Sequence, residues 1–115
     1  MSGFFLVVGC GGTAKDDPTP EDIDAVAAAV ADIVYQCRSY TAGHVAAPDA
    51  QALERDVDAL LEAYGRLEPD TSFEVGADAG IPRKTSLRKE LRFGARVLND
   101  DCLPEQAERL SEAAG

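Results

Sequence analysis

Three cysteines, one histidine and several groups of charged residues are the parts of this chain that could do chemistry. The cysteines are Cys10, Cys37 and Cys102, and His44 is the single histidine. A thiol can form a disulfide, bind a metal or act as a nucleophile, depending on its compartment and its neighbours. No Ser/His/Asp, Cys/His or zinc-ligand spacing includes His44. We therefore expect no metal or other cofactor and no enzymatic activity, and we expect His44 to cap a helix or to face water.

Acidic pairs raise the question of a calcium site or of a catalytic carboxylate pair. They are Asp16-Asp17, Asp56/Asp58 and Asp100-Asp101. An EF-hand loop starting at Asp70 would need a glycine in sixth place and a glutamate in twelfth, where this chain has Val75 and Ile81. We interpret these pairs as solvated charge. A hydrolytic carboxylate pair stays open, because the separation of two carboxylates is a property of the fold and not of the sequence.

Basic residues concentrate near the C-terminal third of the chain. Six of the eleven lysines and arginines lie there, with Glu90 among them: Arg83, Lys84, Arg88, Lys89, Arg92 and Arg96. Arg88, Arg92 and Arg96 follow i,i+4 spacing, so they form one stripe on a helix. Such a stripe could contact anionic lipid headgroups or an acidic partner. The alternative is that it balances acidic residues inside the protein.

The composition favours one small acidic domain. The chain has 115 residues, a formal net charge of −10 and no tryptophan. A surface of this charge repels phosphates, so we expect no nucleic-acid partner. No apolar run approaches the roughly 18 residues that a membrane-spanning helix needs. Many alanines and more arginines than lysines are associated with high-GC bacterial genomes.

The residues before Cys10 carry the one family resemblance in the chain. Val7-Val8-Gly9-Cys10 resembles the lipobox of bacterial membrane lipoproteins, in which the signal peptide is cut before a cysteine that is then lipidated. The resemblance implies that Cys10 is the first mature residue and anchors the protein to a membrane. A secretory signal has a basic first part and a longer apolar core than Phe4–Val8, so we expect it to begin upstream of Met1.

The resemblance also predicts the compartment and the domain layout. With Cys10 lipidated, Cys37 and Cys102 remain as a pair that an oxidising, extracytoplasmic cell-envelope location would allow to form a disulfide. Residues 1–9 are then a truncated signal-like segment, 10–18 a flexible tether and 19–115 a folded domain. Its function would be to bind an envelope component or protein.

Two alternatives do not use the lipobox. Phe4–Val8 could be a buried strand followed by a glycine turn, faintly like a dinucleotide-binding turn, although no helix follows it. The chain would then be a soluble cytoplasmic regulatory or inhibitory module with three free thiols.

Helical periodicity dominates the remainder of the chain. The first helix is predicted from a Thr19 cap to about Ala42, with Gly43 as its left-handed terminator. Its apolar face carries Ile23, Val26, Val30, Ile33, Val34 and Cys37. The second is predicted from about Asp49 to Leu67. Its buried positions are Leu53, Val57, Leu60, Leu61, Tyr64 and Leu67.

The C-terminal half is predicted to contain a long loop and two more helices. We expect residues 70–83 to form an extended loop held to the core by Phe73 and Val75. A third helix is predicted from Thr85 or Ser86 to about Leu98, and a neighbouring helix should approach closely at Gly94, since glycine is otherwise unfavourable there. A short helix should begin at Pro104 and fray through residues 113–115.

The expected fold is all-α: a three-helix up-down-up bundle with a short C-terminal fourth helix and a flexible N-terminal segment. In this arrangement the first and third helices end at the same pole of the bundle. Cys37 lies near the first of these ends and Cys102 just after the other. The helix pattern therefore brings together the two cysteines that the lipobox leaves over.

Overall fold

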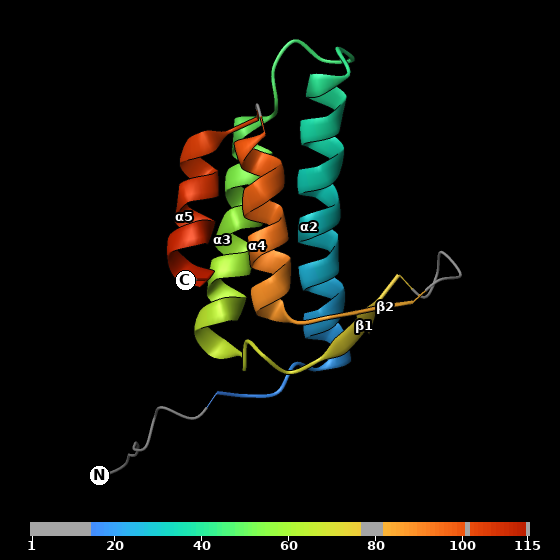
Figure 1. Ribbon diagram of the computed structural model, residues 1–115, viewed down its shortest axis with the longest axis vertical. Coiled ribbons are helices and arrows are strands. Elements are labelled where there is room, and N and C mark those ends of the chain that lie inside the picture. Colours follow the sequence, from blue (N-terminus) through green and yellow to red (C-terminus); the bar gives the residue numbers. More distant parts are fainter. Residues whose placement is uncertain (1–14, 77–81, 101, 115) are drawn as a thin grey trace.

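Four helices and one short antiparallel hairpin make up the described part of the chain. The computed structural model describes residues 15–76, 82–100 and 102–114. The elements are α2 (Pro20–Thr41), α3 (Ala50–Arg66), β1 (Phe73–Val75), β2 (Arg83–Thr85), α4 (Leu87–Asn99) and α5 (Pro104–Ala114). Figure 1 shows the helices side by side, with successive helices running in opposite directions. The predicted mainly helical fold is confirmed.

Both predicted ends of α2 are confirmed. At its start, the Thr19 hydroxyl accepts from the Asp22 N–H at 3.2 Å, and the Asp22 carboxylate accepts from the Thr19 N–H at 3.0 Å. At its end, Gly43 has a φ of 81°. The N–H groups of Gly43 and His44 donate to carbonyls of the last turn at 3.0 and 2.9 Å, as in a Schellman motif. The backbone of His44 therefore caps the helix, as predicted.

The next two helices also begin at side-chain caps. Asp49 accepts from the Ala52 N–H at 3.1 Å at the start of α3. Of the two candidates for α4, Ser86 is the cap, because its hydroxyl accepts from the Lys89 N–H at 3.3 Å. Thr85 belongs to β2 instead.

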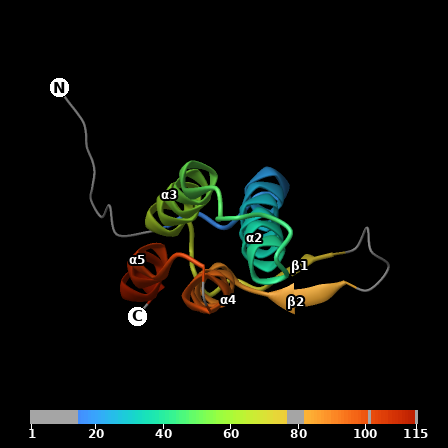
Figure 2. The same cartoon turned by 90° about the horizontal axis from the view of Figure 1, so that it is seen from above.

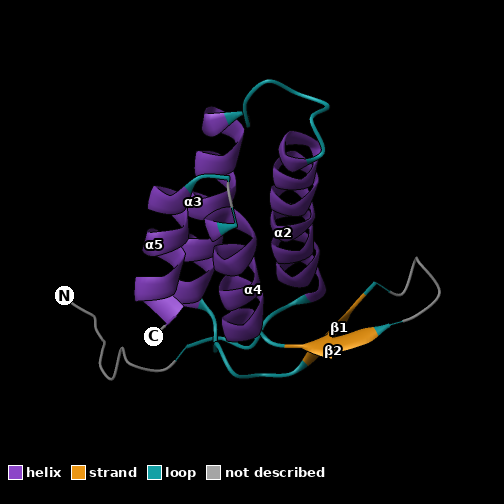
Figure 3. Cartoon of the chain, turned by 45° about the horizontal axis from the view of Figure 1, so that its top comes forward, coloured by secondary structure: helices purple, strands orange, loops and turns teal. Residues whose placement is uncertain are grey.

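The prediction of a loop over residues 70–83 is wrong, because part of this segment belongs to the hairpin of β1 and β2 (Figure 3). Phe73 pairs with Thr85, and Val75 pairs with Arg83. Phe73 and Val75 are buried as expected, so β1 does hold this segment to the core. The second strand was missed because its first two residues are exposed and basic, which leaves no alternation of apolar and polar residues to recognise.

All four helices contribute to one core (Figure 2). The largest fully buried apolar side chains come from every helix, and most are leucines: Ile33, Leu53, Leu60, Leu67, Leu87, Leu91, Leu98 and Leu110. The apolar stripes read from the sequence therefore face each other. Burial of such side chains is the main favourable term in the folding of a domain of this size.

Gly94 lies where side chains of other helices converge on α4. A Cβ atom at this position would lie 3.4 Å from Leu110 Cδ1 and 3.7 Å from Ile33 Cδ1. These are ordinary contact distances to the ends of long side chains, so side chains and not the backbone of a neighbouring helix fill the space beside Gly94. These side chains come from α5 and α2.

The prediction that the last helix frays through residues 113–115 is wrong for residues 113 and 114, which are helical. Helix α5 extends to Ala114, whose side chain is buried. The Ala114 carbonyl accepts a hydrogen bond from Arg88 Nη1 at 2.9 Å. This charged donor satisfies a carbonyl that a helix end otherwise leaves to water, so the last turn is held against the start of α4.

The segment before α2 is hydrogen-bonded to the base of the bundle. The Asp16 N–H donates to the Arg66 carbonyl at 3.3 Å, and the Glu68 N–H donates to the Asp16 carbonyl at 2.7 Å. Lys15 is the first described residue. The part of the expected tether that follows it is therefore joined to the end of α3.

Candidate functional site

The residues proposed from the sequence divide into described and undescribed ones. Cys10, the expected lipidation site, and the apolar run Phe4–Val8 lie outside the described residues. The structure brings Cys37 and Cys102 together at one end of the bundle. It places the three arginines of the basic stripe in two different environments.

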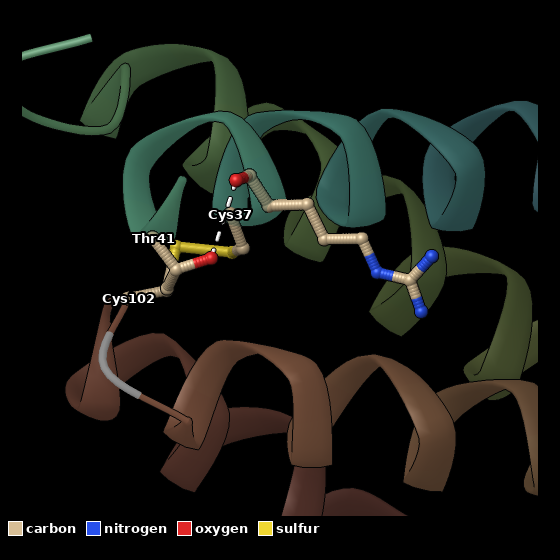
Figure 4. The surroundings of a disulfide bond; sticks show 4 residues. Cys37, Thr41 and Cys102 are labelled. Carbon is tan, nitrogen blue, oxygen red and sulfur yellow. Dashed lines mark hydrogen bonds between the residues drawn. A yellow bond between two sulfur atoms is a disulfide. The ribbon is translucent and has the colours of Figure 1, made fainter. Parts of the chain in front are cut away.

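Cys37 and Cys102 lie at disulfide distance, as the helix pattern predicted (Figure 4). Their Cα atoms are 5.4 Å apart across a sequence separation of 65 residues. Cys37 is in the last two turns of α2, Cys102 follows α4, and both side chains are buried. The pair therefore connects the ends of two helices that are distant in sequence.

Arg88 joins four parts of the protein. Its Nε and Nη2 donate to the two carboxylate oxygens of Asp70 at 2.8 and 3.2 Å, and its Nη1 donates to the Tyr64 hydroxyl and the Ala114 carbonyl, each at 2.9 Å. The hydrogen bonds from Arg88 hold the pKa of Asp70 below its usual value. For this arginine the internal contacts favour charge balance within the protein over an external partner.

Arg92 and Arg96 have a different environment. Both side chains are exposed, and both line an open groove of about 780 Å³ between α4 and α5. Glu105 and Glu108 line the opposite side. Within the described ranges, neither arginine forms an ion pair. Two of the three stripe arginines are therefore available to a partner.

Glu90 is a buried carboxylate that the sequence did not single out. Its side chain is 2% exposed, and its Oε2 accepts from the Thr85 hydroxyl at 2.9 Å and from Arg83 Nη1 at 3.3 Å. These bonds attach β2 to α4. In the sequence Glu90 is one acid within a basic segment, and nothing in its spacing marks it as buried.

Asp56 and Asp32 form a carboxyl pair between α3 and α2. Burial, followed by the hydrogen bond and the charge of Asp32, raises the pKa of Asp56 to about 7. Oδ2 of Asp56 is buried and has no donor among the described residues. A proton shared between the two carboxyls would satisfy this atom. Gln36 Nε2 donates to the other carboxyl, that of Asp32, at 3.5 Å.

The expected solvated pair Asp56/Asp58 is therefore divided between two environments. Asp58 is exposed and forms an ion pair with Arg109 at 2.7 Å. Asp56 has its partner 24 residues away on another helix, a relation that sequence spacing cannot reveal. The pair joins two helices, and its contact depends on a proton because two charged carboxylates would repel each other. We therefore interpret the pair as a proton-dependent contact between helices.

The described ranges contain no cluster of three or more metal-binding side chains. They also contain no helix with both the length and the apolar character to cross a bilayer. The His44 side chain is exposed and borders a shallow hollow beside Tyr35 and Arg38.

Comparison of the chain with protein-family models, curated proteins and solved structures found no match.

Proposed function

We propose that this protein is a small, acidic, extracytoplasmic domain anchored by a lipid on Cys10 in a bacterial cell envelope. In this proposal it is not an enzyme and binds a protein or another envelope component. The observation that supports it is the approach of Cys37 to Cys102. A pair at this distance suits an oxidising compartment and leaves one cysteine, which ends the lipobox-like Val7-Val8-Gly9-Cys10.

The proposed layout places a signal-like segment at 1–9 and a bundle of up-down-up order from residue 19, with α5 as its short fourth helix. The proposed tether covers residues 10–14 and not 10–18, because Asp16 is hydrogen-bonded to the end of α3. The lipid would then attach close to the end of the bundle where α2 begins. Stable anchoring requires two or more acyl chains, each buried CH₂ contributing about 0.8 kcal/mol.

Arg92 and Arg96 are the proposed contact with anionic headgroups or an acidic partner. They are exposed and unpaired within the described ranges, whereas Arg88 is excluded from this role by its bonds to Asp70, Tyr64 and Ala114. Each basic residue near an anionic surface contributes about 1 kcal/mol.

Mass spectrometry of the protein from its native host tests the proposal. We expect a mature N-terminus at Cys10 carrying acyl mass, and peptides that join Cys37 to Cys102. A Cys10→Ser variant should lose the acyl mass and leave the membrane fraction. An intact Met1 or Ser2 with three free thiols would contradict the proposal and favour the cytoplasmic regulatory module.

A further inference from the structure

One side of α2 presents apolar side chains that the other described elements cover only in part. Tyr35 and Val45, at 69% and 42% exposure, are the large hydrophobic residues most exposed in the described ranges. Tyr35 is on α2, and Val45 follows it. Ala31 on the same helix is also exposed, and Val34 is half-buried.

This side of α2 borders a trough. The hairpin extends beside α2 and α4, away from α5 (Figure 2). The trough is the hollow between these elements, and it has a volume of about 580 Å³. Its apolar lining comes from α2, β1 and α4: Ala27, Val30, Ala31, Val34, Val75 and Phe93. The four residues from α2 follow i, i+3, i+4 and i+7 spacing, so they form one continuous stripe.

A second hollow continues the trough towards the end of α2. It has a volume of about 450 Å³ and shares Ala31, Val34 and Arg38 with the first. Tyr35 and His44 border it on the far side. Arg38 therefore lies where the trough and the second hollow meet.

The charges around the trough leave one positive group uncompensated. Arg83 and Glu90 both line it, but they pair with each other at 3.3 Å. Arg38 forms no ion pair within the described residues. An unpaired guanidinium beside an apolar stripe is complementary to an anion that carries an apolar chain.

We propose that the trough binds a single-chain carboxylate amphiphile of the fatty-acid class. Its carboxylate pairs with Arg38, and its alkyl chain lies along the α2 stripe towards Ala27 and Phe93. At a rise of about 1.5 Å per residue, Ala27 and Arg38 are roughly 16 Å apart along the helix. An extended chain of about a dozen carbons has this length, and the volume of the trough lies in the usual range for ligand sites of about 300–1,000 Å³.

Other occupants fit the trough less well. A second copy of the protein would be repelled, because each molecule carries a net charge of −10. An extended peptide would need backbone hydrogen bonds, and most of the lining comes from helices, whose backbone groups are bonded internally. A neutral alkyl compound would leave Arg38 without a counterion. The proposed ligand does not depend on lipidation of Cys10, so either idea can fail alone.

Calorimetry and NMR with dodecanoate test this proposal on the full chain, below the concentration at which dodecanoate forms micelles. We expect saturable binding at one site, with chemical-shift changes centred on Ala31, Val34 and Phe93. Arg38→Gln should weaken binding about tenfold or more, the loss of one charge-assisted contact. Arg55→Gln makes the same charge change on an exposed residue of α3, outside both hollows, and should bind like the wild type.

Two further measurements separate recognition of the chain from recognition of the carboxylate. Ala31→Trp should fill the trough and abolish binding, while circular dichroism confirms that the variant is folded. Dodecanol should bind the wild type and Arg38→Gln equally, and about tenfold more weakly than dodecanoate binds the wild type. Absence of saturable dodecanoate binding, full affinity in Arg38→Gln, or unchanged binding by folded Ala31→Trp would each overturn the proposal.

Discussion

At the scale of single residues, Asp56 is the group from which we expect a pH response near neutrality. Its pKa is raised from the ordinary 3.8 to about 7 by burial and by the neighbouring Asp32. The folded state therefore binds a proton more tightly than the unfolded state does. The stability that this proton contributes is fully present below about pH 4 and is lost as pH rises through about 7. The pKa values of Asp22 and Asp70 are lowered from 3.8, so the stability that these two carboxylates contribute is lost only as the pH falls below about 4.

We predict that the melting temperature falls between pH 5 and pH 8 and that Asp56→Asn removes most of this fall. Because the carboxyl is only partly buried, screening by solvent reduces the effect, and we expect a stabilisation of about 1 kcal/mol by Asp56→Asn at pH 8. Thermal unfolding at both pH values measures it. Asp58→Asn, at an exposed position on the same helix, is the control and should keep the wild-type pH dependence. An equal fall in Asp56→Asn would show that another group is responsible.

At the scale of elements, local signals predicted the helices well. Thr19 and Asp22 marked the start of α2, and Gly43 marked its end, because caps are satisfied by residues close in sequence. The hairpin was missed because Arg83 and Lys84 carry no apolar alternation. Arg88 was assigned correctly to a helical stripe, but its bonds to Asp70 and Ala114 depend on how separate elements pack. The Asp32–Asp56 pair likewise depends on how α2 and α3 pack, which the sequence does not show.

Helix α4 also carries the proposed contact with a charged surface. We predict that Arg96→Glu weakens binding of the protein to vesicles of anionic lipid by about thirtyfold, because it removes one positive charge and adds a negative one, at about 1 kcal/mol per charge. Co-sedimentation at low and high salt measures this, and the difference should shrink in high salt. Arg55→Glu makes the same change on an exposed residue of α3 and serves as the control. If both variants bind equally, net charge and not this face governs the interaction.

At the scale of the whole molecule, the cysteine pair contributes to the stability of a domain with a small core. A bond across 65 residues stabilises by about 4 kcal/mol in the chain-entropy model. Domains have total stabilities of about 5–15 kcal/mol, so this share is large. All four helices and the Cys37–Cys102 approach followed from apolar periodicity and loop length. Which faces remain open, such as the trough beside α2, did not follow, because that depends on where the hairpin lies.

We predict that a reducing agent lowers the melting temperature of the purified protein markedly. The double variant Cys37→Ala/Cys102→Ala should melt near the temperature of the reduced wild type and should not respond to the reductant. Scanning calorimetry with and without reductant gives both values. A wild type whose melting temperature is the same under both conditions would show that the two thiols are not bonded.

A Cys37–Cys102 bond also closes a covalent ring that contains the end of α2, α3, the hairpin and α4. Most of α2 and all of α5 lie outside this ring. The exposed segment from Ala42 to Ala47 belongs to this ring. A protease that cuts the chain once in this segment therefore opens the ring without releasing a fragment. The nicked protein remains a single covalent molecule, heavier by one water, until a reductant separates the two pieces.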